Sequence, residues 1–189
     1  MPAIIDLSER AEPVLMIAPG VCLRPLAASE VTARYIDGIN DPQINKFLVS
    51  AQSGPQTLDG VKEWVTANWQ AHDAILFGIF CSRIHCGNIR AHDVTKHRAS
   101  IGIAIFDSKM HGKGIGCAAI SALVRYLMDE LGIKSVVAGI DEGNVASQRA
   151  FAKAGFERLP AQDAQHCALW SFVGRENVRM GNSVNIRDE

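Results

Sequence analysis

Apolar positions along this chain follow two periods, and the changes between them mark a succession of strands and helices. Short apolar runs rich in β-branched or aromatic residues, bounded by Gly, Pro or Asp, predict strands. These runs cover residues 21–26, 74–81, 85–91, 99–106 and 135–140, and two last ones at 156–158 and 167–173 predict a hairpin. Apolar residues three or four positions apart predict helices. They cover residues 30–39, 58–72, 118–131 and 145–154, with Ser29 and Thr57 as caps of the first two.

The order of these elements indicates the fold class. It reads β-α-α-β-β-β-α-β-α-β-β, in which a meander of three strands precedes a crossover helix. This order predicts an α/β domain of the α+β kind, built on a mixed sheet with helices rather than on a regular βαβ repeat. We expect one domain over residues 21–174. A loosely held extension at 1–20 precedes it, and a polar C-terminal tail at 175–189 follows it.

Composition narrows the classes of function. The net charge of −1 gives no basic surface for nucleic acid, and 21% charged with 48% hydrophobic residues is typical of globular proteins. No apolar run reaches the ~18 residues of a membrane span, and the N-terminus lacks the pattern of a secretory signal. The five cysteines include no C-x-x-C pair. We therefore expect neither a metal site nor a disulfide framework, and a cytoplasmic location.

A glycine-rich loop lies between the apolar run 101–106 and the helix that follows it. The loop reads His111-Gly112-Lys113-Gly114-Ile115-Gly116-Cys117. Three glycines at a spacing of two leave room for a ligand to approach the backbone N–H groups. The N-terminus of the following helix adds a partial positive charge at the same place. The loop therefore predicts a binding site for a phosphorylated ligand.

Two common phosphate-binding motifs do not fit this loop. A P-loop needs a Ser or Thr directly after its Gly-Lys pair, and here Gly114 follows Lys113. A dinucleotide fold needs G-x-G-x-x-G in an early βαβ unit, whereas this loop has G-x-G-x-G late in the chain. Neither a nucleotide triphosphatase nor a dinucleotide enzyme is therefore the favoured interpretation.

A third interpretation combines the loop with a second motif. His111-x-x-Gly114-x-Gly116 resembles the acetyl-CoA loop of the GNAT family of N-acetyltransferases, and the opening segment 23–26 resembles a common first strand of that family. The second family signature is an N-x-x-[AS] helix that ends in K-x-G-F. It is matched at Asn144, Ser147, Lys153, Gly155 and Phe156. The resemblance covers about residues 21–174. Within the family, the sequence is similar to the branch that acetylates ribosomal-protein N-termini, and related members of that branch act on amino sugars or antibiotics.

The resemblance implies how acetyl-CoA, the co-substrate, is bound. The GNAT fold has a central sheet that splays open, here between the strand 101–106 and the strand 135–140. The pantetheine arm lies in that gap, and an N–H near Ile105 polarises the thioester carbonyl. Backbone N–H groups of the loop hold the pyrophosphate. The expected coenzyme-binding residues are Ile103, Ala104, Ile105, His111, Gly112, Lys113, Gly114, Ile115, Gly116, Cys117 and Asn144.

The resemblance also assigns catalytic residues, with two departures from the family pattern. Asn144 orients coenzyme A, or it is simply a helix cap. The family often has a tyrosine acid seven residues later, but Phe151 stands there, so Ser147 becomes the candidate acid, or else an ordinary first-turn hydroxyl. Ser100 occupies the position of a frequent glutamate base. The open candidates for the base are His97, Asp93, His85, Glu142 and a water molecule.

These features lead to one expected function and one alternative. We expect an N-acetyltransferase that moves an acetyl group directly to a primary amine. The acceptor is either a small molecule, such as an amino sugar, or the N-terminus of a protein. In the family the elements around Trp64 and Trp69 roof the acceptor site, although both side chains also suit a core. The alternative is a GNAT module that binds acyl-CoA without turnover, and the family's frequent dimers leave a homodimer open.

Overall fold

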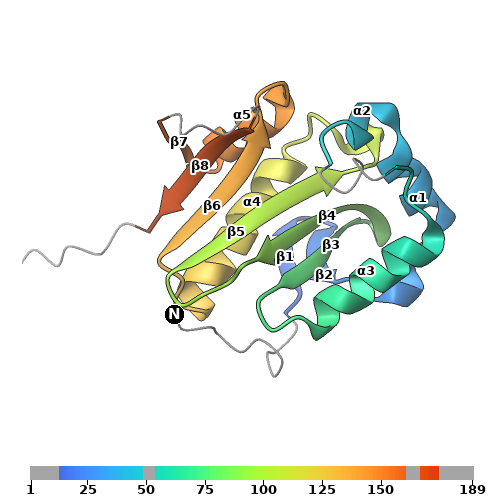
Figure 1. Cartoon of the computed structure of the whole chain (residues 1–189), viewed down its shortest axis with the longest axis horizontal. Coiled ribbons are helices and arrows are strands. Elements are labelled where there is room, and N and C mark those ends of the chain that lie inside the picture. The colour runs from blue at the N-terminus through green and yellow to red at the C-terminus, as the bar shows by residue number, and fades with distance from the viewer. Residues whose placement is uncertain (1–12, 49–53, 161–166, 175–189) are drawn as a thin grey trace, which may run out of the picture.

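One mixed sheet of eight strands organises the chain. The computed structural model describes residues 13–48, 54–160 and 167–174. The strand order is β1-β2-β3-β4-β5-β6-β8-β7, and all neighbours are antiparallel except β5 and β6 (Figure 1). The strands are β1 (Leu15–Ala18), β2 (Val21–Pro25), β3 (Ile75–Cys81), β4 (Ile84–His92), β5 (Arg98–Ile105), β6 (Ser135–Asp141), β7 (Glu157–Arg158) and β8 (Cys167–Val173).

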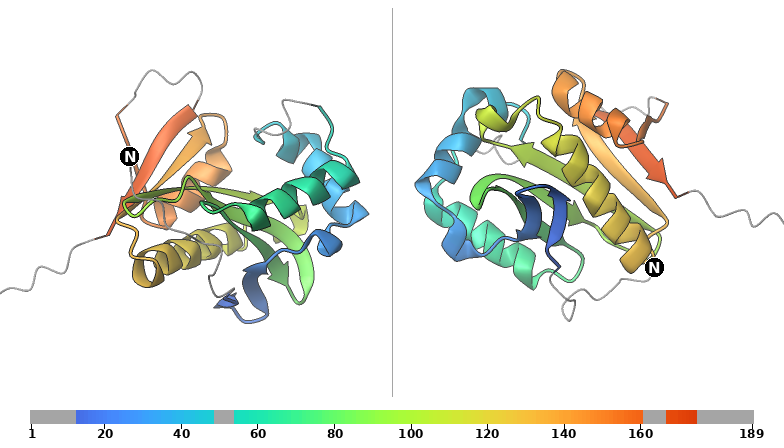
Figure 2. Two further views of the ribbon diagram at one scale, coloured as in Figure 1. Left: turned by 60° about the horizontal axis from the view of Figure 1, so that its bottom comes forward. Right: turned by 180° about the vertical axis from the view of Figure 1, so that it is seen from behind.

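Helices cover both faces of this sheet. Figure 2 shows α1, α2 and α3 on one face and α4 and α5 on the other. Their bounds are α1 (Ala33–Asn40), α2 (Pro42–Asn45), α3 (Leu58–Gln70), α4 (Ile115–Arg125) and α5 (Val145–Lys153). Two 3-10 turns, η1 (Ala28–Glu30) and η3 (Ser108–Met110), and a π-helical end of α4, η4 (Tyr126–Glu130), complete the chain.

The two helical layers bury separate hydrophobic clusters. The larger cluster lies between the sheet and α4 and α5, and it includes Ile101, Leu123, Val136 and Phe151. The smaller cluster packs α1 and α3 onto β3, and it includes Tyr35, Val65 and Leu76. Alternation along each strand sends successive side chains to these two layers.

Most of the predicted elements are confirmed. Thr57 caps α3 by accepting a hydrogen bond from the Gly60 N–H at 3.2 Å. The predicted hairpin is the antiparallel pair of β7 and β8. Helix α4 begins at Ile115 rather than 118, because Gly114 takes a left-handed conformation and serves as its N-cap.

Two predictions near the N-terminus are wrong. A loosely held extension was predicted over residues 1–20, but Leu15–Ala18 forms β1 on the edge of the sheet. Leu15 and Ile17 of this strand pack against the larger cluster. The predicted helix 30–39 is divided: Glu30 ends the turn η1, and α1 starts after Thr32 as its cap. The division follows from the Glu30 carboxylate, which Arg24 and the Ala27 N–H hold in place. The tail 175–189 and residues 1–12 of the predicted extension lie outside the described residues.

The central sheet splays as the resemblance implied. β5 and β6 pair in parallel only at Arg98–Ser135, Ala99–Val136 and Ser100–Val137. Beyond these pairs β5 stays joined to β4 as far as Ile105, while β6 stays joined to β8 as far as Asp141. The two strands therefore diverge toward their carboxyl ends, and the glycine loop follows directly after one of them.

Candidate active site

The glycine loop is exposed and precedes the first hydrogen-bonded turn of α4. Gly112 and Gly114 have φ angles of +73° and +78°, and no atom lies within 4 Å of a Cβ built on either. The first backbone hydrogen bond of α4 runs from the Ala118 N–H to the Gly114 carbonyl at 3.0 Å. The N–H groups before Ala118 therefore lack partners inside the helix. Together with the helix dipole they form a site for an anion such as a pyrophosphate.

His111 ties this loop to the end of β5. Its Nε2 lies 2.7 Å from the Ile105 carbonyl oxygen, which can only accept, so Nε2 carries the proton and donates it. The backbone N–H of His111 donates to the Ser108 carbonyl at 3.1 Å. The side chain that departs from the family motif therefore fixes the distance between the loop and the strand, a role that the sequence did not reveal.

The backbone of β5 exposes polar groups to the gap between β5 and β6. Successive residues of a strand send their N–H and C=O groups to opposite edges. Phe106 donates to Cys86 of β4 at 3.1 Å, so Ala104 also faces β4. Ser135 of β6 donates to the carbonyl of His97 at 3.0 Å, so residues of odd number face β6. Ile103 and Ile105 therefore face the gap, where β6 has already turned away.

Helix α5 forms the other wall of the site. Asn144 caps it, with Oδ1 accepting from the Ser147 N–H at 3.0 Å. Among the described residues no group hydrogen-bonds to the Ser147 hydroxyl, which is half-buried. Ala150, one turn further on, lies 3.8 Å from a Cβ built on Gly116 of the loop. Because residues three apart share a helix face, Ser147 also faces the loop and the gap.

Phe151 does not face the site. Its ring is 1% exposed and packs edge-on against Phe156, with centroids 5.0 Å apart. It belongs to the core beneath α5. The tyrosine that the family often has here is thus replaced by a purely structural residue, which leaves Ser147 as the hydroxyl nearest to the gap on this helix.

The sheet face opposite α4 has an open floor beside the gap. Ser100 pairs with Val137, so Gly102 and Gly139, two residues further on, occupy equivalent positions on the same face. Both glycines are exposed, and no atom lies within 4 Å of a Cβ built on Gly102. This face of the gap is therefore open to a ligand, whereas the glycine loop leads into α4 on the other face.

The four candidate bases lie in different places. His97 and Asp93 are in the turn between β4 and β5, at the end of β5 opposite to Ile105. Glu142 lies at the carboxyl end of β6, beside the site, and is ion-paired with Arg158. Asp141, the last residue of β6, is a further carboxylate that the sequence analysis did not select. Its Oδ1 accepts a hydrogen bond from the Gly143 N–H at 2.7 Å. The sequence feature that could have identified it is its position at the carboxyl end of the predicted strand beside the gap, where ligands of α/β proteins often bind.

His85, the fourth candidate, is enclosed rather than exposed to the gap. Its ring contacts those of Tyr35, Phe80 and Phe106 at centroid distances of 4.9–5.0 Å. Its Nε2 bonds to Asn88, which donates to the Tyr35 hydroxyl. Burial lowers the pKa of His85, against a smaller opposing effect of the Asn88 bond, and burial raises the pKa of Tyr35 to about 12. This cluster stabilises α1 on β4.

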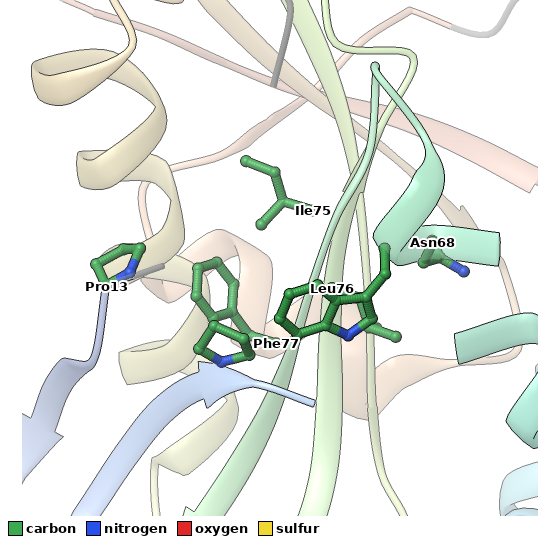
Figure 3. A pocket seen from close by; sticks show the side chains of 7 residues that line it. Pro13, Asn68, Ile75, Leu76 and Phe77 are labelled. Atoms are coloured by element: carbon green, nitrogen blue, oxygen red, sulfur yellow. The ribbon is translucent and has the colours of Figure 1, made fainter. Parts of the chain in front are cut away.

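A pocket visible at the surface lies away from this site. Figure 3 shows it between the end of α3 and the start of β3, with Pro13 and Phe77 at its rim. Ile75 pairs with Ala91 and Ala91 with Ile101, so the pocket is at the opposite end of the strands from the glycine loop. Within the described ranges no three His, Cys, Asp or Glu side chains gather as a metal site requires, and no helix is long and apolar enough to span a membrane.

Comparisons with known proteins agree with this geometry. The model of the acetyltransferase (GNAT) domain family matches residues 21–157. A crystal structure of a probable acetyltransferase is 24% identical with a TM-score of 0.74, over 85% of this chain and 97% of that one. The ribosomal L7/L12 α-N-protein acetyltransferase RimL, in complex with coenzyme A, is 19% identical with a TM-score of 0.74, over 85% and 98%.

An antibiotic-modifying enzyme shares the same fold. The aminoglycoside acetyltransferase AAC(6′)-Ib, in complex with coenzyme A, is 18% identical with a TM-score of 0.66, over 81% of this chain and 94% of that one. The comparison with curated proteins gave no match. The family match extends from β2 to β7 and includes both the loop and the Asn144 helix. This chain therefore belongs to the GNAT family and is an acetyl-CoA-dependent acetyltransferase.

Proposed function

We propose that this protein transfers the acetyl group of acetyl-CoA directly to a primary amine, on a small molecule such as an amino sugar or at the N-terminus of a protein. The divergence of β5 and β6 carries the proposal. It leaves the backbone groups of Ile103 and Ile105 beside the glycine loop on one side and the open floor on the other. A thioester and an amine can therefore meet in the gap from opposite faces.

The donor half of the mechanism uses backbone groups. N–H groups from Gly112 to Cys117 hold the pyrophosphate, and the pantetheine arm lies along Ile103 and Ile105 as an added strand does. An N–H of β5 that faces the gap donates to the thioester carbonyl and stabilises the negative charge that forms on it. Lys113, exposed on the loop, adds a positive charge near the phosphates.

The acceptor amine attacks the thioester carbon, and the C–S bond breaks as the amide forms. The departing thiolate takes a proton from the Ser147 hydroxyl, which regains one from solvent. The amine loses a proton to water or to a carboxylate at the carboxyl end of β6, for which Glu142 and Asp141 are the two candidates. An α-amine with a pKa near 8 needs less help from a base than a lysine does.

The activities of two structural relatives suggest acceptor classes to test. RimL acts on the N-terminus of a ribosomal protein, and AAC(6′)-Ib acts on aminoglycosides. The purified protein should therefore be assayed for free coenzyme A with acetyl-CoA and a panel of peptides, amino sugars, aminoglycosides and polyamines. We expect thiol release with at least one class.

Ser147→Ala tests the proposed acid. We expect kcat to fall about a hundredfold or more with unchanged acetyl-CoA affinity, since a positioned acid contributes roughly 10²–10⁴-fold. Ser121→Ala on α4 is the control and should leave kcat unchanged. Binding of acetyl-CoA by calorimetry without thiol release for any acceptor would instead support the non-catalytic acyl-CoA-binding alternative.

A further inference from the structure

We propose that Arg90 binds a carboxylate of the acceptor, so that the preferred acceptors carry an acidic group near the amine that is acetylated. The inference rests on the proposed function, because it concerns what the open face of the sheet receives. It adds a specificity-determining residue and a substrate class to that function.

Arg90 stands directly beside the open floor. It pairs in register with Gly102 of β5 on one side and with Leu76 of β3 on the other, so all three residues share the face that α3 covers. Leu76 packs into the cluster beneath α3, whereas Gly102 is exposed. Arg90 therefore lies at the border between the covered and the open part of this face, one strand away from the gap.

Comparison with Arg24 shows what Arg90 lacks. These are the two half-buried arginines in the part of the chain that the structure describes. Arg24 holds both carboxylate oxygens of Glu30 and stacks on Phe80, with its Cζ 3.6 Å from the ring centroid. Arg90 has no carboxylate within ion-pair distance among the described residues. A half-buried cation without a counter-ion is costly, and a bound anion relieves that cost.

The Arg90 side chain is held in position by its neighbours. Its Nε donates to Oδ1 of Asn68, a residue only 4% exposed, and Nδ2 of Asn68 donates to the Trp64 carbonyl at 2.8 Å. The guanidinium carbon lies 5.9 Å from the centroid of the Trp64 ring. With Nε occupied, the two Nη nitrogens have no partner among the described residues. They form the fork that binds a carboxylate through two hydrogen bonds.

Two carboxylates, Asp93 and Asp73, act on Arg90 through space without contacting its guanidinium. Burial lowers the pKa of Arg90, and Asp93 and Asp73 only partly oppose that effect from a distance. Neither of these carboxylates approaches closely enough to be an ion pair. Trp64, 39% exposed, adds an aromatic wall next to the fork. Together these residues suit an acceptor with a carboxylate and an apolar spacer.

The test compares acceptors that differ only in charge. Acetyl-CoA is supplied with ω-amino acids of two to six carbons against their primary amides. It is also supplied with dipeptide amides that have aspartate or glutamate against asparagine or glutamine as the second residue. We expect kcat/KM to favour the carboxylate of the best pair by about 10- to 100-fold, as one charge-assisted hydrogen bond allows.

Two variants and one control complete the test. Arg90→Gln should abolish the preference by lowering kcat/KM for the carboxylate acceptor to that for its amide, while acetyl-CoA affinity is unchanged. Asn68→Asp, which keeps the shape but gives Arg90 a carboxylate of its own, should do the same. Arg125→Gln, exposed on α4 across the sheet, should keep the preference. Equal rates with both members of every pair, or a preference that survives both variants, would overturn the inference. Absence of thiol release with any amine would overturn the proposed function itself.

Discussion

The two faces of the splayed sheet recognise their ligands in different ways. On the α4 side the groups that we propose to bind acetyl-CoA are backbone N–H groups of one loop and one strand, within the segment from Ile103 to Cys117. On the α3 side the proposed acceptor contacts are side chains from separate elements, such as Arg90, Trp64 and Asp141. Recognition by backbone groups requires glycines and the ends of strands and helices at particular positions of one segment. Recognition by side chains from separate elements leaves no such pattern in any single segment. The difference explains why the coenzyme half is visible in the sequence and the acceptor half is not.

The largest effect should come from a side chain placed in the backbone-binding loop. Gly114→Val puts a β-branched residue at φ +78°. We expect acetyl-CoA affinity in calorimetry to fall at least about a hundredfold, since several charge-assisted hydrogen bonds are misplaced at once.

A matched control for Gly114 lies at the other end of the same helix. Gly132 has a φ of +68° and the same empty surroundings. Gly132→Val should cost similar stability, roughly 1–2 kcal/mol for a left-handed residue, without weakening acetyl-CoA binding. Equal losses of affinity in both variants would mean that the loop does not bind through its backbone.

A side chain on the open floor should affect only the acceptor half. Gly102→Val meets no atom within 4 Å, and a β-branched residue suits a strand. We expect kcat/KM for the amine to fall about tenfold or more by steric exclusion, with acetyl-CoA affinity and melting temperature maintained. Ser171→Val, further along the same face on β8, is the control and should leave kcat/KM unchanged. A loss of acetyl-CoA affinity in Gly102→Val would contradict the separation of the two faces.

A smaller effect is expected at His111, which joins the loop to β5. His111→Ala removes the hydrogen bond to the Ile105 carbonyl. One such bond contributes about 0.5–1.5 kcal/mol, so acetyl-CoA affinity should weaken roughly 2- to 10-fold. His111→Arg keeps a donor and should retain most of the affinity. If Ala and Arg behave alike in calorimetry, the hydrogen bond has no part in shaping the loop.

The smallest effect concerns stability on the acceptor side. Because burial lowers the pKa of His85, the unfolded chain takes up a proton below about pH 6.5 that the folded chain does not. The free energy of unfolding should therefore decrease as the pH falls from about 6.5 toward the folded pKa. In denaturant titrations His85→Gln should flatten this slope, whereas a variant of the exposed turn histidine, His97→Gln, should not. An unchanged slope in His85→Gln would show that folding does not lower the pKa of His85.

The sequence predictions were accurate for features that neighbouring residues determine and failed for features that distant residues determine. Thr57, Asn144 and Gly132 act within a few residues of their own positions, so the turns and helix ends that they form were predicted from local chemistry. The edge strand β1 was missed because Leu15–Ala18 is a strand only through its pairing with β2. The start of α1 was misplaced because Arg24, six residues away, holds Glu30 in a separate turn.

By itself the sequence determined the order of the strands and helices apart from β1 and α2, the phosphate-binding loop and the second motif that together indicate the family. It could do so because glycine conformations, caps and apolar periodicity depend on neighbouring residues. The tertiary structure decided which backbone groups of β5 face the gap, that Phe151 is core, that His85 is enclosed, and that Arg90 lacks the carboxylate that Arg24 has. These properties depend on the register and packing of segments distant in the chain, which no local pattern encodes.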